Sequence, residues 1–255
     1  MSVYKNCFNP EEEIRHICDW IKNYFVSNGP EAKAVIGISG GKDSTIAAAL
    51  LCRTLGPEQV IAVLMPQGEQ NDFEDALRVC EYLKINDNKY IINIEDICNI
   101  LYSELNFVDL FPNDRVLTNT PARIRMSILY AVAAIVGGRV VNTCNHSEDF
   151  VGFSTKYGDL AGDFSLFKNY CVSEVLQIGD YLGLPKDLVH KAPSDGMCGM
   201  NDEEKMGFTY QEVDNMLLYN ELPEYEKYKK IIQAHENNKH KECINLPAPK
   251  KVMWR

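Results

Sequence analysis

Apolar positions along this chain follow two patterns, short continuous runs and longer stretches with helical spacing. Almost continuous apolar runs are typical of strands buried on both faces of a parallel sheet. Four such runs cover 34–38, 60–65, 90–94 and 139–143. Between them, apolar residues spaced three and four apart predict amphipathic helices. The expected helices cover 14–25, 44–55, 73–83, 94–105 and 121–136, the last with Pro121 at its first position.

Strands that alternate with helices predict a doubly wound α/β fold, in which helices flank a parallel sheet. We expect one domain over residues 1–255, with a mobile loop around 195–207 and a charged, exposed helix over 221–241. Ligands of such sheets bind beyond the carboxyl ends of the strands. Three segments with candidate chemistry fall there, at 39–44, 65–68 and 143–148.

The composition is that of an ordinary globular protein, with 45% apolar and 24% charged residues. The net charge of −10 argues against a protein that binds nucleic acid through broad phosphate neutralisation. The nine cysteines form no Cys-x-x-Cys pair, so we expect reduced thiols in a cytoplasmic protein. We find no N-terminal leader and no apolar run of membrane length, and therefore expect no membrane partner.

A glycine-rich segment, SGGKDS at 39–44, joins the first expected strand to the following helix. Paired glycines allow the backbone to approach a ligand closely, and the N-terminus of a helix adds partial positive charge. In isolation the same residues would form an ordinary capped turn. Their place between a buried strand and a helix favours a phosphate site.

This segment is not a Walker loop, because that motif needs glycine at position 36 and a hydroxyl residue directly after the lysine. The chain has Ile36 and Asp43 at those places. An acidic side chain inside a phosphate loop repels the ligand unless a divalent cation lies between them. Asp43 is therefore a candidate Mg²⁺ ligand.

The loop resembles the Ser-Gly-Gly-x-Asp-Ser signature of the N-type ATP pyrophosphatases, which have an adenine nucleotide alpha hydrolase-like fold. That resemblance implies cleavage of ATP to AMP and pyrophosphate through an adenylated intermediate. Further segments are similar to motifs of the NAD synthetase family within this group. They are PARIRM at 121–126, TCNHSE at 143–148, GFSTKYGD at 152–159, APS at 192–194 and HK at 240–241.

The resemblance implies roles for individual residues, carried over position by position. Asp43 and Glu148 correspond to the catalytic Mg²⁺ ligands. At Val172 the family has a further ATP-contacting lysine, which Lys168 is expected to replace. The other residues expected to bind ATP are Gly37, Ile38, Ser39, Gly40, Gly41, Lys42, Asp43, Ser44, Met65, Thr143 and Ser194. Those expected to bind deamido-NAD are Arg123, Lys156, Asp163, His240 and Lys241.

The implied reaction is the amidation of deamido-NAD to NAD by ammonia, with ATP as co-substrate and Mg²⁺ as cofactor. The nicotinate carboxylate attacks the α-phosphorus, and ammonia then displaces AMP from the acyl-adenylate. This chemistry needs positioning and charge stabilisation rather than a nucleophilic residue. Because we find no domain for glutamine hydrolysis, we expect free ammonia or a separate protein to supply the nitrogen.

The family resemblance also implies a homodimer. The first helix, with Trp20 at its edge, and the helix from Pro121 are candidates for the contact, although either can instead face the core.

Two other functions stay open at this stage. One is another enzyme of the pyrophosphatase type, such as a tRNA-modifying ligase or a GMP synthetase fragment, and the acidic charge argues against the tRNA version. The other is a nucleotide-binding sensor without catalysis. Val172 at the lysine position favours the sensor, whereas the two acids Asp43 and Glu148 argue against it.

Overall fold

Five parallel strands form one sheet in the spatial order β3-β2-β1-β4-β5. The structure is a computed structural model that describes residues 8–70, 72–191, 202–241 and 249–251. The strands are β1 (Ala34–Gly37), β2 (Val60–Leu64), β3 (Lys89–Ile91), β4 (Arg139–Asn142) and β5 (Phe164–Ser165). The chain direction across the sheet switches between β1 and β4, the place where ligands of doubly wound sheets bind. The predicted fold class is confirmed.

The helices follow the strands in alternation and then continue to the C-terminal part. Those up to β4 are α1 (Pro10–Asn28), α2 (Lys42–Leu55), α3 (Phe73–Tyr82), α4 (Glu95–Phe107) and α5 (Asp114–Val136). The later helices are α6 (His146–Val151), α7 (Val172–Tyr181), α8 (Lys186–Val189), α9 (Asp202–Met206), α10 (Tyr210–Tyr219) and α11 (Tyr225–Asn238). Short 3₁₀ turns are η1 (Pro57–Gln59), η2 (Asn86–Asn88) and η3 (Lys239–Lys241).

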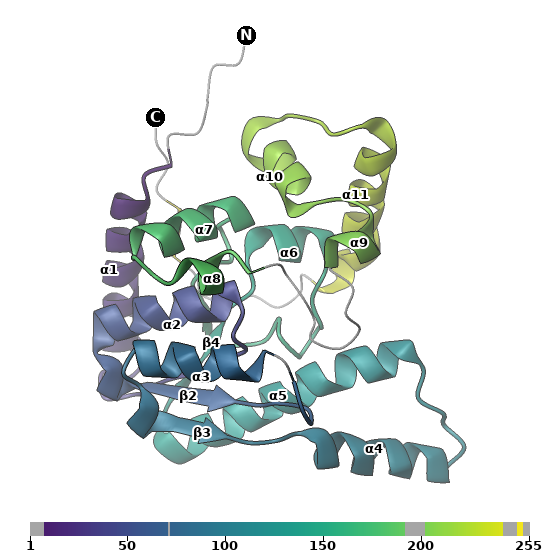
Figure 1. Cartoon of the computed structure of the whole chain (residues 1–255), viewed down its shortest axis with the longest axis horizontal. Helices are drawn as coiled ribbons and strands as arrows, with labels where there is room; N and C mark the ends of the chain where they lie inside the picture. Colours follow the sequence, from purple (N-terminus) through teal and green to yellow (C-terminus); the bar gives the residue numbers. More distant parts are fainter. Residues whose placement is uncertain (1–7, 71, 192–201, 242–248, 252–255) are drawn as a thin grey trace.

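Helices cover both faces of the sheet (Figure 1). On one face α1, α2, α3, α7 and α8 enclose the larger apolar core, which includes Ile36, Leu50 and Phe164. On the other face α4 and α5 cover a smaller core around Val63 and Val140. Burial on both faces explains the continuous apolar runs of the strand sequences. Within the described residues, no helix is both long enough and apolar enough to cross a membrane.

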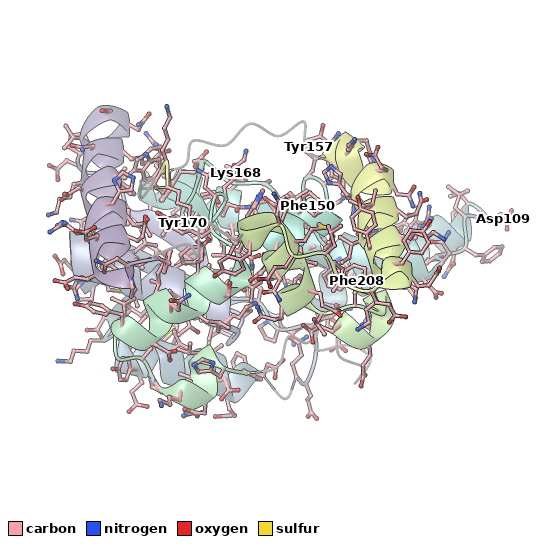
Figure 2. The ribbon with its side chains drawn as sticks, turned by 90° about the horizontal axis from the view of Figure 1, so that it is seen from above. Asp109, Phe150, Tyr157, Lys168, Tyr170 and Phe208 are labelled. Atoms are coloured by element: carbon pink, nitrogen blue, oxygen red, sulfur yellow. The ribbon has the colours of Figure 1, made fainter. Side chains whose placement is uncertain are left out.

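A third apolar cluster joins α6 and α7 to the helical lobe, which we define as α9, α10 and α11. In Figure 1 this lobe lies beside α6, and Figure 2 shows Phe150 and Phe208 on the lobe side and Tyr170 toward α1. A buried carboxylate fixes the junction, because Asp214 on α10 accepts hydrogen bonds from the Ser147 hydroxyl at 2.5 Å and the Ser173 amide at 2.7 Å. The short helix α6 is thereby held between the sheet and the lobe.

The helix expected to start at Pro121 starts at Asp114 instead, so the prediction that Pro121 holds the first helical position is wrong. Asn113 caps this earlier start, since its side chain accepts a hydrogen bond from the Val116 amide at 3.2 Å. A proline inside a helix removes one backbone hydrogen bond, and here the proline is buried among its neighbours. Tertiary packing thus outweighs the local signal.

Other differences concern short elements. β3 ends at Ile91 rather than at residue 94, and the two-residue strand β5 was not predicted because it is too short to show a pattern. The loop expected around 195–207 is helical at Asp202–Met206, and its first part lies outside the described residues. The charged C-terminal helix is present as α11.

Gly40 allows the glycine loop to pass directly against the start of α3. Its φ is +82°, and a Cβ at this position would lie 2.7 Å from the Asp72 carbonyl oxygen and 2.9 Å from the Ala76 nitrogen. These neighbours are backbone atoms, so they cannot move aside without shifting α3. A residue with a side chain is therefore strained here in both conformation and space.

Gly40→Ala is expected to lower the free energy of unfolding by about 1–3 kcal/mol, because it adds left-handed strain and a backbone clash. Urea denaturation followed by circular dichroism measures this change. The matched control is Gly41→Ala, since Gly41 has φ −84° and an added Cβ would meet only the Ser39 hydroxyl, at 3.3 Å. Equal losses in the two variants would contradict the special role of Gly40.

Candidate active site

A cavity of about 430 Å³ opens at the carboxyl ends of β1, β2 and β4. It therefore lies at the switch point of the sheet, as expected for a ligand site in this fold class. Among the residues predicted to act on ATP or metal, those that line it are Gly37, Ile38, Ser39, Gly41, Lys42, Asp43, Ser44, Met65, Thr143 and Glu148. The structure thus brings three separate sequence motifs to one place.

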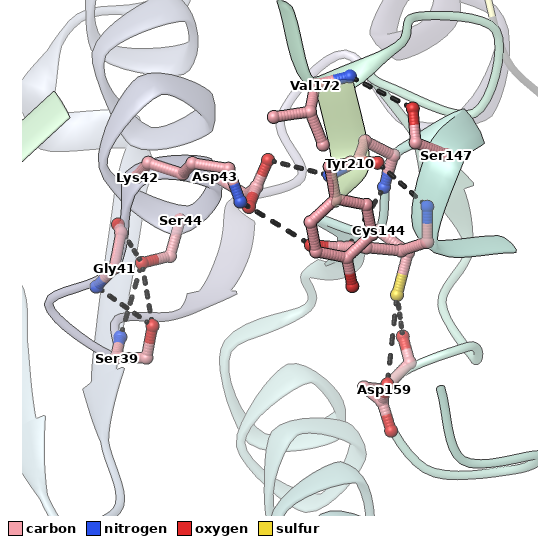
Figure 3. A network of polar contacts seen from close by, with 12 residues as sticks. Ser39, Gly41, Lys42, Asp43, Ser44, Cys144, Ser147, Asp159, Val172 and Tyr210 are labelled. Atoms are coloured by element: carbon pink, nitrogen blue, oxygen red, sulfur yellow. Dashed lines mark hydrogen bonds and ion pairs between the residues drawn. The ribbon is translucent and has the colours of Figure 1, made fainter. Parts of the chain in front are cut away.

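The glycine loop forms the wall of the cavity at the start of α2 (Figure 3). Its hydroxyl groups stabilise the turn: the Ser39 and Ser44 Oγ atoms lie 3.1 Å apart, and Ser39 Oγ accepts a hydrogen bond from the Gly41 amide at 3.2 Å. Gly41 is the N-cap of α2 and has no side chain to cap the first turn. The first amides of the helix are consequently suited to an anionic ligand such as phosphate.

Two carboxylates lie close together in the cavity, Asp43 at the start of α2 and Glu148 on α6. Asn145 joins them, because its side-chain amide donates to Asp43 Oδ1 at 3.2 Å while its side-chain oxygen accepts from the Glu148 amide at 3.0 Å. The Lys42 ammonium also reaches both acids, at 2.7 Å from Asp43 Oδ2 and 3.5 Å from Glu148 Oε1. Lys42 on α2 and Asn145 at the start of α6 therefore hold the predicted pair of acids in place.

Burial and charge shift the ionisation of this cluster. Burial raises the pKa of Glu148 far above its usual range, and the Asp43 carboxylate raises it further. Burial alone would lower the pKa of Lys42, but the charges of Asp43 and Glu148 outweigh it and raise that pKa. When both acids are ionised, the two carboxylates exceed the single ammonium by one negative charge, so a further cation at this site would favour the ionised form of Glu148.

A magnesium ion fits these residues. Within the described part of the chain, no group of three or more His, Cys, Asp or Glu side chains could hold a metal ion. Asp43 and Glu148 supply a pair of carboxylates beside the glycine loop. Mg²⁺ commonly takes one or two carboxylates and completes its coordination with water and substrate phosphates. The acid pair beside a phosphate-type loop matches that preference.

The residues expected at deamido-NAD form a second cluster, linked through backbone carbonyl groups. Arg123 Nε donates to the Lys156 carbonyl at 3.2 Å, and Lys156 Nζ donates to the His240 carbonyl at 2.8 Å. Lys241 Nζ donates to the carbonyls of Gly152 at 2.7 Å and Ser154 at 2.8 Å. These contacts bring α5, the loop after α6 and η3 together, so that residues distant in sequence form one cationic group.

Several predicted contacts do not line the cavity within the described residues: they are Gly40, Asp163, Lys168 and the four cationic residues of the second cluster. The Asp163 carboxylate accepts a hydrogen bond from the Val140 amide at 2.7 Å and holds β4. Lys168 is absent from the described residues that line the cavity, and Val172 packs in the apolar cluster of the helical lobe. Ser194 lies outside the described residues. The ligand roles of Asp163, Lys168 and Ser194, like those of the other site residues, stay predictions.

Sequence reasoning missed several residues at the site. Arg125, Asp159 and Lys191 line the cavity, and the Arg125 guanidinium donates to the Met65 carbonyl at 3.0 Å. Burial lowers the pKa of this arginine. Asn145 could have been found, because Asn145 and Glu148 have the spacing of a capping box directly after a strand. No local signal marks Lys191, which is held by Asp72 and Asp75 from α3 and the turn before it.

Another unpredicted contact comes from Asn142, the last residue of β4. The Asn142 side chain donates to the carbonyls of Asp159 at 2.6 Å and Ala161 at 3.2 Å, and it accepts from the Cys144 amide at 3.1 Å. It therefore fixes the loop that carries Asp159 against the end of β4.

A parallel α/β sheet with a phosphate-type loop at its switch point defines a nucleotide-binding protein of the doubly wound class. Comparison with known families narrows this class: the family model described as NAD synthase matches residues 13–246. The chain belongs to the NAD synthase family.

Curated relatives and solved structures agree with this membership. An NH₃-dependent NAD⁺ synthetase from Archaeoglobus fulgidus is 35% identical over 240 residues, which cover 91% of this chain and 94% of that protein. Among solved structures, an NMN synthetase from Francisella tularensis has a TM-score of 0.84 and 34% identity, with 94% of this chain and 98% of that one covered. An NH₃-dependent NAD synthetase from Campylobacter jejuni has a TM-score of 0.75 and 28% identity, with coverage of 96% and 99%.

Glu148→Gln is expected to raise the melting temperature of the metal-free protein by about 2–4 °C, which corresponds to about 1 kcal/mol. The sign follows from the pKa of Glu148, which burial raises to about 8: near neutral pH this group is ionised in the unfolded chain and must take up a proton on folding, and the neutral amide avoids that cost. Differential scanning calorimetry in the presence of a chelator measures the change. The exposed Glu81→Gln is the control and should leave the melting temperature unchanged. A lower melting temperature for Glu148→Gln would contradict the unfavourable burial of this charge.

Proposed function

We propose that this protein catalyses the ATP-dependent amidation of deamido-NAD to NAD with ammonia, and that it releases AMP and pyrophosphate. The observation that carries this proposal is the position of the acid pair Asp43 and Glu148 directly beside the glycine loop in one cavity. Family membership supports the same reaction. An acidic pair has little purpose in a plain nucleotide sensor, so catalysis is favoured over that alternative.

The reaction takes place in two steps. The nicotinate carboxylate oxygen forms a bond to the α-phosphorus of ATP, and the bond to pyrophosphate breaks. Ammonia then attacks the acyl carbon of the adenylate, AMP leaves with the carboxylate oxygen, and a proton passes to water. The glycine loop and the start of α2 bind the phosphates, and Asp43 and Glu148 would hold Mg²⁺, which supplies positive charge to the leaving pyrophosphate. Arg123 and Lys156 bind and orient the anionic acid substrate.

The purified protein is expected to form NAD and AMP in equal amounts from deamido-NAD, MgATP and ammonium, as followed by liquid chromatography. Asp43→Asn should lower kcat/KM by about 100-fold or more, because it removes charge stabilisation at the reacting phosphate. The exposed Asp87→Asn serves as the control with full activity. If the parent protein forms neither product over a range of pH and metal ions, the proposed function is wrong.

A second acid substrate has its own support, because an NMN synthetase is among the similar structures and its TM-score of 0.84 exceeds the 0.75 of the NAD synthetase from Campylobacter jejuni. Nicotinate mononucleotide would undergo the same adenylation and amidation. We favour deamido-NAD, since the curated relative compared above is an NH₃-dependent NAD⁺ synthetase. The same assay, run with deamido-NAD and with nicotinate mononucleotide, decides between the two acids. If kcat/KM is at least about tenfold higher for the mononucleotide, that acid and not deamido-NAD is the substrate.

We also propose a homodimer that associates through the layer of α4 and α5. Large apolar side chains are strongly exposed there, including Ile100 on α4 at 64% and Ile135 on α5 at 84%. Such exposed apolar surface is typical of association sites. The apolar stripe of α1 is a weaker candidate than the sequence suggested, because Ile17 and Ile21 are fully buried in the core.

Ile100→Glu combined with Ile135→Glu is expected to convert the dimer to a monomer, because two charges are then placed in an apolar interface. Size-exclusion chromatography with light scattering measures the mass. Val26→Glu, an equally exposed position on α1, is the control and should remain dimeric. A double variant that stays dimeric, or a control that dissociates, would contradict the assignment of this face.

The proposed setting is the cytoplasm. All cysteines within the described residues are free thiols, which suits a reducing compartment. The net charge of −10 suits small-molecule substrates and gives no support for a nucleic-acid partner.

A further inference from the structure

Lys42 has an unusual place, because its ammonium lies between the two acids proposed to bind the metal. The side chain is only 8% exposed, and its Nζ atom is 2.7 Å from Asp43 Oδ2 and 3.5 Å from Glu148 Oε1. In Figure 3, Lys42 and Asp43 leave the start of α2 side by side and point across the site, and the dashed lines run toward the turn that begins α6. A cation of the protein itself thus already neutralises part of the acid pair.

The position of this ammonium creates a conflict with a bound metal. A divalent ion ligated by the same two carboxylates competes for the oxygen atoms that Lys42 contacts, because the other oxygens, Asp43 Oδ1 and Glu148 Oε2, accept hydrogen bonds from Asn145. The two cations would also repel each other at a short distance. With both present, three positive charges would face two negative charges in a largely buried place. Such a surplus is unfavourable, so one cation must leave when the other binds.

The acids themselves do not depend on Lys42 alone for their positions. Asn145 holds Asp43 Oδ1 through its side-chain amide, and the Asn145–Glu148 capping box holds the start of α6. Ser147, next to Glu148, is fixed by the buried Asp214. The pair can therefore keep its geometry while the ammonium is replaced.

We propose that Lys42 is a stand-in cation: it holds Asp43 and Glu148 together when no metal is present, and it leaves their oxygen atoms when Mg²⁺ binds. Lys42 is then a positioning residue that sets the metal affinity of the site. This proposal rests on the metal role of the two acids given above, but it does not depend on which acid substrate is amidated.

The test is Mn²⁺ binding without nucleotide, measured by electron paramagnetic resonance of the free ion. If Lys42 competes with the metal, Lys42→Gln should bind Mn²⁺ at least about tenfold more tightly than the parent protein, because the competing charge is gone. Adding Glu148→Gln to this variant should abolish the gain. A lysine with a purely structural role would lower stability on substitution but would not raise metal affinity.

Lys191→Gln is the matched control, since Lys191 also lines the cavity and pairs with two carboxylates, but with Asp72 and Asp75. Its substitution should change Mn²⁺ affinity by less than about threefold. Equal or weaker Mn²⁺ binding by Lys42→Gln, or an equal gain in Lys191→Gln, would overturn the proposal.

If Lys42→Gln does not fold in the presence of a chelator, circular dichroism with and without Mg²⁺ gives the answer. The proposal predicts that saturating Mg²⁺ restores folding, because the metal then replaces the missing ammonium; a variant that stays unfolded overturns it. This test is independent of the proposed reaction. If the parent protein makes no NAD but Lys42→Gln binds Mn²⁺ more tightly, the proposed reaction is wrong and the proposed exchange of cations still holds.

Discussion

The site depends on one electrostatic constraint, two carboxylates held close together where little water reaches them. Asp43 and Glu148 repel each other, and burial adds to the cost of their charges. The surrounding structure offsets that cost with the Lys42 ammonium, the Asn145 amide and the positive end of α2. A bound divalent cation together with phosphate groups would complete the charge balance of this site.

The helical lobe supports this pair from a distance. Asp214 accepts hydrogen bonds from α6 and α7, and the apolar cluster around Val172 packs the same helices against α10. Where the resembled family has an ATP-contacting lysine, this chain has a valine that contributes to packing. Positive charge at the cavity comes instead from Lys42, Arg125 and Lys191, which line it from α2, α5 and the segment after α8.

In the second cluster, hydrogen bonds to backbone carbonyl groups hold the cationic side chains in place. Arg123, Lys156 and Lys241 each donate to backbone carbonyl groups of a neighbouring segment. These hydrogen bonds use carbonyl oxygens rather than carboxylates, although the charge of the Asp159 carboxylate also acts on Lys241. The cluster can therefore attract an anionic substrate. The NAD synthase family and the proposed amidation of a nicotinate acid agree with such a cluster beside a phosphate site.

Local sequence determined most of the framework, because continuous apolar runs and helical spacing report burial directly. It also identified the glycine loop, Asp43 and Glu148, since these residues belong to compact motifs that are readable within a few positions. It could not show that α5 begins at Asp114, because packing overrides the local signal of Pro121. Nor could it show that Asp163 holds β4, that Lys191 reaches the cavity, or that Lys42 bridges both acids. Those facts depend on contacts between segments far apart in the chain, which only the tertiary structure decides.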